Sequence, residues 1–133
     1  MRLFTNVFLL CLFTSCQSQP TVEKTFLCGR YSVEIELPEI VKIQEHKFVE
    51  GKTTVLTTKD TVVIEFYCGG NYIPHISNRK RYKILSENNN SSKGIDLETN
   101  LYWRKDGRLI YSNCKASDTA YYNKIFNKKI IKK

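Results

Sequence analysis

The chain has 133 residues, a length that suits one compact domain and is too short for two. Its 21 Lys and Arg residues outnumber its 13 Asp and Glu residues, so the formal net charge is +8 at pH 7. Aromatic and β-branched residues occur throughout the chain, which excludes a disordered composition.

The first sixteen residues have the pattern of an export signal. Arg2 provides a positive start, residues 3–13 form an apolar run broken only by Thr5 and Asn6, and Thr14 and Ser15 are small residues just ahead of Cys16. The run is too short for a permanent membrane-spanning helix. Residues 13–16 resemble a bacterial lipobox, in which the cysteine becomes the lipidated first residue. An ordinary signal peptide with a chance cysteine is the alternative, but the polar segment that follows at once favours a tethered anchor.

This N-terminal pattern divides the chain into three parts. We expect a signal peptide at residues 1–15, a lipidated cysteine and flexible tether at residues 16–24, and a single domain at residues 25–133. Cys16 would carry more than one acyl chain, palmitate among them, and each buried methylene contributes about 0.8 kcal/mol to membrane attachment. The protein is then expected to sit on a membrane without crossing it.

The first half of the domain is expected to consist of strands. Alternating apolar and polar residues, β-branched runs and turn residues indicate strands at residues 26–37, from 40–43 onward, at 53–58 and at 61–68. The last of these is the strongest, because Val62, Ile64 and Phe66 share one face. Gly69 and Gly70 end it.

Residues 71–98 are harder to interpret. Residues 81–85 are expected to form a short strand, and the Asn- and Ser-rich residues 88–94 are expected to form an exposed loop.

An Asp-Gly pair between two β-prone runs predicts a hairpin. Asp106-Gly107 would form a two-residue type I′ turn, in which both central residues have positive φ. In that register Trp103 faces Ile110 and Tyr102 faces Tyr111.

The apolar period changes after Cys114 and predicts a helix. Ser117 or Asp118 can cap its N-terminus, and the apolar stripe consists of Tyr122, Ile125, Phe126 and Ile130. The expected fold class is therefore α+β, with an antiparallel β-sheet of about five to seven strands and a C-terminal amphipathic helix packed on one face.

The cysteines of the domain suggest one disulfide and one free thiol. An exported protein meets an oxidising compartment, where two of Cys28, Cys68 and Cys114 can pair. Simple up-and-down strand alternation brings Cys28 and Cys68 to the same end of the sheet, which makes them the preferred pair and Cys114 the alternative partner. With no C-x-x-C pair and only His46 and His75 to assist, no metal site is expected.

Basic residues gather in two places that are candidate binding sites. One cluster contains Arg79, Lys80 and Arg81, and the other contains Lys128 and Lys129 near the C-terminus. A solvated surface is the ordinary explanation of such runs. The sharper interpretation is contact with an acidic protein partner or an anionic envelope component. Export argues against a nucleic-acid partner.

No catalytic constellation is evident, so no enzyme and no cofactor are expected. A cysteine–histidine pair would need a third group to orient the imidazole. Glu34 and Glu36 fall on the outward face of their strand, where solvated carboxylates are common. The glycines at 69 and 70 lack the Lys-Ser/Thr of a phosphate-binding loop.

Several segments together resemble the small lipoproteins of Bacteroidota that combine a lipobox signal with one small α+β domain. These segments are the signal ending at Cys16, the 31–39 strand with its Pro-Glu end, the 60–64 strand, residues 101–104 and the Lys-rich helix around residues 125–128. No acidic cluster follows Cys16, so the resemblance implies the periplasmic face of the outer membrane.

The expected function is that of a membrane-anchored bacterial lipoprotein with a non-enzymatic binding domain. An immunity-type protein that guards the periplasm against a toxin is the concrete version. A structural or assembly accessory of the cell envelope is the alternative, and a small periplasmic enzyme ranks third.

Overall fold

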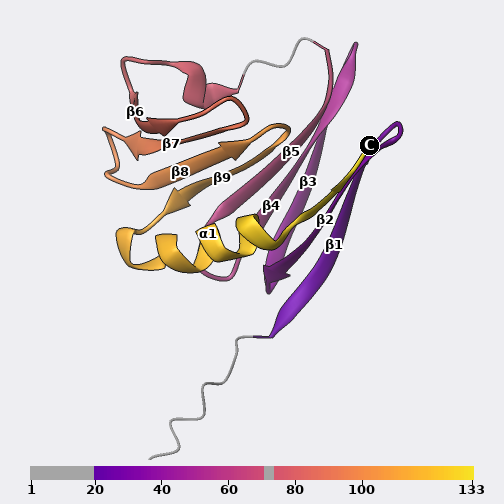
Figure 1. Ribbon diagram of the computed structural model, residues 1–133, viewed down its shortest axis with the longest axis horizontal. Coiled ribbons are helices and arrows are strands. Elements are labelled where there is room, and N and C mark those ends of the chain that lie inside the picture. Colours follow the sequence, from indigo (N-terminus) through magenta and orange to yellow (C-terminus); the bar gives the residue numbers. More distant parts are fainter. Residues whose placement is uncertain (1–19, 71–73) are drawn as a thin grey trace, which may run out of the picture.

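The computed structural model describes residues 20–70 and 74–133, and these residues form an α+β domain, as predicted (Figure 1). The expected signal peptide and the lipidation site Cys16 lie outside the described residues. The strands are β1 (Thr21–Cys28), β2 (Tyr31–Pro38), β3 (Ile40–Phe48), β4 (Gly51–Thr58), β5 (Val63–Gly69), β6 (Tyr82–Glu87), β7 (Ser91–Asp96), β8 (Tyr102–Asp106), β9 (Leu109–Cys114) and β10 (Ile130–Lys132). The helix α1 (Thr119–Lys128) follows a 3-10 turn, η2 (Ala116–Asp118), and a second 3-10 turn, η1 (His75–Ser77), precedes β6.

The strands form two antiparallel sheets rather than the expected one. The larger sheet has seven strands in the order β3-β4-β5-β9-β8-β7-β6, and the smaller has the order β1-β2-β10. The second sheet arises because residues 26–37 are not one strand. Gly29 has a φ of +60°, which suits a tight turn, and it reverses the chain so that Cys28 pairs with Tyr31.

The smaller sheet also takes in part of the expected tether. Residues 21–24 were expected to be flexible, but β1 begins at Thr21 and pairs with β2 along its whole length. A short polar strand is difficult to distinguish from a linker by composition, because its order comes from ladder hydrogen bonds to a neighbour.

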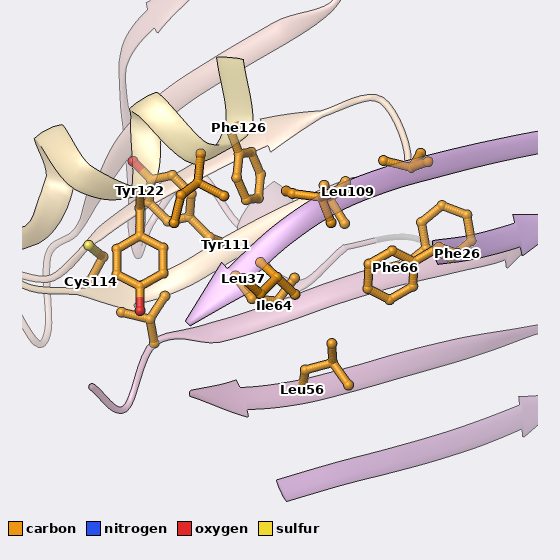
Figure 2. Close-up of a cluster of buried hydrophobic side chains, with 14 residues drawn as sticks. Phe26, Leu37, Leu56, Ile64, Phe66, Leu109, Tyr111, Cys114, Tyr122 and Phe126 are labelled. Atoms are coloured by element: carbon orange, nitrogen blue, oxygen red, sulfur yellow. The ribbon is translucent and has the colours of Figure 1, made fainter. Parts of the chain in front are cut away.

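The main core lies between one face of the seven-stranded sheet and a layer made of the smaller sheet and α1 (Figure 2). Phe26 of β1 stacks on Phe66 of β5 with ring centroids 4.9 Å apart. Tyr111 of β9 meets Phe126 of α1 edge to face at 5.0 Å. These contacts join segments far apart in the sequence, so the layers depend on each other for burial.

A disulfide between Cys28 and Cys68 joins the two sheets, which confirms the preferred pairing. Their Cα atoms are 5.4 Å apart, at the ends of β1 and β5. Cys114 is the free cysteine among the described residues and is fully buried in the main core.

A second, smaller core covers the other face of the larger sheet. It consists of Ile76 from η1, Tyr82, Trp103 and Ile110. Trp103 and Ile110 alternate along their strands with Arg104 and Tyr111, which face α1, so the two cores lie on opposite faces.

Residues 88–94 are not the expected loop, because β7 begins at Ser91. The turn is only Asn88 to Asn90, and the Asn88 Oδ1 atom accepts hydrogen bonds from the backbone N–H of Asn90 and Ser91 at 3.0 and 2.8 Å. Gly94, which suggested a loop, is required in the strand because the Trp103 indole lies directly against it.

The β8–β9 hairpin exists, but the predicted register is wrong. Asp106 pairs with Leu109, so the two-residue link is Gly107-Arg108, and Tyr111 lies opposite Arg104 instead of Tyr102. Only Gly107 of the link has a positive φ, +57°, which is typical of a type II′ turn. Asp106 is kept inside the strand because its carboxylate is buried in an ion-pair network described below.

The C-terminal helix largely follows the prediction. Tyr122, Ile125 and Phe126 are its buried residues. Ile130 is not part of the stripe, because the helix ends at Lys128 and Ile130 begins β10 beside β2. Among the described residues, no helical segment has the length and apolar character needed to span a bilayer.

Candidate binding groove between the helix and the smaller sheet

A groove of about 610 Å³ lies between α1 and the β1–β2 hairpin. This volume falls within the range of sites that hold small ligands or side chains of a partner. Its apolar lining is Ile35, Tyr121, Ile125 and Ile130, and its charged lining is Glu23, Glu34, Glu36, Lys124 and Lys128. The groove therefore combines an apolar surface with carboxylates on the sheet side and ammonium groups on the helix side.

Strand register and helix period place these side chains. In the β1–β2 ladder Glu23 lies directly opposite Glu36, so both project from the same face. Along α1, Tyr121, Lys124 and Lys128 are spaced three and four residues apart, and so they share one side of the helix. That side adjoins the stripe that packs into the core.

Most charges of the groove lack a counter-ion within the described part of the chain. Glu34 is bound by Lys132 at 3.0 Å. In residues 20–70 and 74–133, no ion pair within 4.0 Å engages the other two carboxylates, Glu23 and Glu36, or either lysine. Like charges placed directly opposite across two strands are destabilising. A bound group carrying both a cation and an anion would offset charges on both walls.

Two of the five basic residues predicted to bind a partner are held in ion pairs. Arg81 donates to Asp96 through Nε and Nη2 at 3.0–3.3 Å and also contacts Glu98. The Nζ atom of Lys129 lies 2.5 Å from Oδ2 of Asp106.

The other three predicted basic residues are exposed but do not form one patch. Lys128 lines the groove. Arg79 and Lys80 lie in the turn between η1 and β6, on the side of the larger sheet opposite α1. The two sequence clusters therefore lie on different elements, and of their residues only Lys128, from the C-terminal cluster, lines the groove.

A buried polar network fixes the C-terminal end of α1, and sequence reasoning missed it. Asp106 is 7% exposed, and its carboxylate accepts hydrogen bonds from Arg104 at 2.7 and 2.9 Å, from Lys129 and from Ser91 at 2.6 Å. Arg104 also donates to the Asn127 side chain at 2.8 Å. Arg104 and Asp106 are separated by one residue in a β-prone run, so they share one face of the strand. This spacing is the signal that could have indicated the network.

This network alters the acidity of its carboxyl group. Burial raises the pKa of Asp106, but the hydrogen bonds from Arg104, Lys129 and Ser91 outweigh burial and hold the pKa below its ordinary value of 3.8. Asp106 is therefore ionised at neutral pH, and it holds the helix end that carries Lys128.

A smaller pocket of about 260 Å³ lies on the opposite face, beside η1. Within it the Nδ1 atom of His75 is 3.6 Å from a carboxylate oxygen of Glu65, and the His75 ring meets Tyr82 edge to face at 5.5 Å.

The cysteines considered as partners for a histidine are all engaged elsewhere. Cys28 and Cys68 form the disulfide, and Cys114 is buried in the main core. Burial, with the nearby Asp118 and Asp60, raises the pKa of the Cys114 thiol to about 12, so it stays protonated. Within residues 20–70 and 74–133 no group of three or more His, Cys, Asp or Glu side chains is arranged to hold a metal ion.

Comparisons with family models, with curated proteins and with solved structures found no match for this chain. The fold and the groove themselves define the class of this protein: an α+β domain with two antiparallel sheets and a charged, partly apolar groove.

Proposed function

We propose that this chain is a bacterial lipoprotein whose domain binds a protein partner without catalysing a reaction, in the manner of an immunity protein. The lipid on Cys16 holds the domain at the periplasmic face of the outer membrane. There it would capture a toxin delivered by neighbouring cells before the toxin reaches its target.

The groove is the observation that carries this proposal. Its apolar lining can bury side chains of a partner, while Lys124 and Lys128 stand exposed at its helix side. These lysines can pair with acidic residues of the partner, and such charge pairs raise association rates and select among partners. The opposed Glu23 and Glu36 select for a cationic group at the other wall.

The anchor places the groove close to the bilayer. Thr21, the first residue of β1, lines the groove. The five peptide steps from Cys16 to Thr21 span at most about 18 Å. A guard protein in this position meets a toxin as it leaves or approaches the membrane.

Protection in cell competition tests the function. Cells that lack the gene are complemented with the wild-type chain, with the double variant Lys124→Glu/Lys128→Glu, or with the control variant Lys80→Glu on the opposite face. We expect the wild-type and control chains to restore survival against kin strains and the double variant to fail at equal protein level. If deletion of the gene leaves survival unchanged, the immunity function is wrong.

A second candidate is an accessory of the cell envelope that contacts anionic lipid through the same lysines. The short reach from Cys16 to the groove favours it, because each Lys near an anionic surface adds about 1 kcal/mol of attraction. Salt-sensitive binding of the delipidated chain to vesicles containing phosphatidylglycerol, and none to pure phosphatidylcholine, would support this candidate over the first. Equal binding to both vesicles would exclude it.

A further inference from the structure

Strand β3 is an edge strand that is exposed on both faces. Among the strands that the structure describes, it pairs with β4 alone, and its other side has no neighbouring strand in the order of the larger sheet. Every residue from Val41 to Phe48 is exposed, and Val41 and Ile43 retain 60% and 58% of their accessible surface. An edge strand with unpaired backbone groups is a template for another strand.

When two copies of β3 run antiparallel, the charges of one copy are complementary to the charges of the other. His46 lies between Glu45 and Lys47. When two antiparallel copies of the strand pair with His46 opposite His46, each Glu45 lies opposite a Lys47 of the other copy. Within one copy Lys47 lies opposite Lys52 of β4, and the Lys52 ammonium group lies 3.4 Å from Glu45 of the same copy. Glu45 of the second copy would give Lys47 a carboxylate neighbour of its own.

We propose that β3 pairs with β3 of a second copy of this chain, so that two seven-stranded sheets become one continuous sheet across a two-fold axis at His46. The paired segment runs from Gln44 to Phe48, and Gln44 lies opposite Phe48 of the other copy. Such an isologous contact closes on itself and does not propagate.

Neighbouring registers are less favourable, which selects this one. A two-fold axis normal to the sheet keeps each face of one copy continuous with the same face of the other copy. Residues that lie opposite each other must then point to the same face, so the axis has to pass through a residue position and not between two residues. With the axis on Glu45 or on Lys47, that residue lies opposite the same residue of the second copy, so two like charges meet. With the axis on Gln44, Glu45 faces Ile43 and Lys47 faces Val41, so no charge is paired.

The geometry is compatible with a shared membrane. The axis is normal to the sheet, so both copies turn their smaller sheet to the same side. The Cys16 tether enters β1 of that smaller sheet, and both anchors can therefore reach one bilayer. The groove lies in the same layer and remains clear of β3.

Disulfide cross-linking in intact cells tests the register. Residues directly opposite in an antiparallel pair have Cα atoms about 4.5–5.5 Å apart, within the range that a disulfide bridges. We expect His46→Cys to give a cross-linked dimer on mild oxidation and Gln44→Cys to give none, since Gln44 lies opposite Phe48. A cross-link at residue 44 as strong as at residue 46, or none at residue 46, would overturn the proposal.

Charge exchange tests the contact without a cysteine. In sedimentation of the full chain in detergent, we expect Lys47→Glu to raise the dimer dissociation constant about thirty-fold, because two attractive cross-strand pairs become repulsive. The double variant Glu45→Lys/Lys47→Glu exchanges the two charges and should restore the wild-type constant. A Lys47→Glu dimer as tight as the wild type, or a double variant as weak as the single one, would contradict the proposal.

Discussion

The carboxylate of Asp106 is predicted to be the most important single polar group for the stability of the domain. Asp106→Ala removes the anion that Arg104 and Lys129 share, while both cations stay in place. The Arg104 and Lys129 side chains are only 7% and 11% exposed, so water cannot replace the lost partner fully.

The size of the effect follows from this burial. Removing one member of a buried ion pair costs about 3–5 kcal/mol, because an uncompensated charge remains inside the protein. Natural domains unfold with free energies of about 5–15 kcal/mol, so Asp106→Ala would remove a large fraction of the total. The exposed pair of Lys132 with Glu34 is the control, since Lys132 is 63% exposed and such pairs contribute about 0–1 kcal/mol.

Urea unfolding with the disulfide intact measures both variants. We expect Asp106→Ala to lower the free energy of unfolding by at least about 3 kcal/mol, and Lys132→Ala to change it by less than about 1 kcal/mol. The pKa of Asp106 is lowered in the folded state. Its contribution to the free energy of unfolding is therefore present above pH 3.8 and is lost as the pH falls through the lower pKa of the folded state. An equal loss of unfolding free energy in the two variants would show that the Asp106 carboxylate has no special role in stability.

Three further predictions concern the core and the cysteines. Gly94→Ala should destabilise the domain by about 3 kcal/mol, because a Cβ there would clash with the Lys83 carbonyl oxygen and the Trp103 ring. A Cβ at Gly70 meets nothing within 4 Å, so Gly70→Ala should be neutral by thermal unfolding. Removal of the Cys28–Cys68 disulfide, whose cysteines are 40 residues apart, should cost about 4 kcal/mol of unfolding free energy, and a loss below about 1 kcal/mol would contradict this. Cys114 should resist iodoacetamide at pH 8 in the folded protein and react only after denaturation, because burial raises its pKa to about 12; rapid labelling of the folded chain would be the contrary result.

The elements that could be predicted from the sequence are those that depend on patterns among residues close together in the chain. The alternation at Val62, Ile64 and Phe66 and the helical stripe at Tyr122, Ile125 and Phe126 both appear as buried faces. These patterns arise from the periods of strand and helix, which depend only on neighbours along the chain.

The features that sequence missed depend on contacts between distant segments. A strand at Ser91–Asp96 exists because Gly94 accommodates the Trp103 ring, and composition alone made this segment a loop. The hairpin register follows the buried carboxylate of Asp106, which outweighs the Asp-Gly turn preference.

The groove could be predicted only in part. Lys128 belonged to a recognised basic cluster, but its neighbour Lys129 is turned inward to Asp106, and sequence cannot distinguish the two. The acidic wall requires the β1–β2 pairing that brings Glu23 opposite Glu36. That pairing depended on a turn at Gly29 inside what looked like one strand.

Both proposed functions require the lipid on Cys16, so the intact mass of the detergent-extracted protein tests them together. We expect a mass equal to residues 16–133 plus acyl groups. A mass without lipid, or a mature chain that begins at another residue, would contradict membrane attachment and with it both functions.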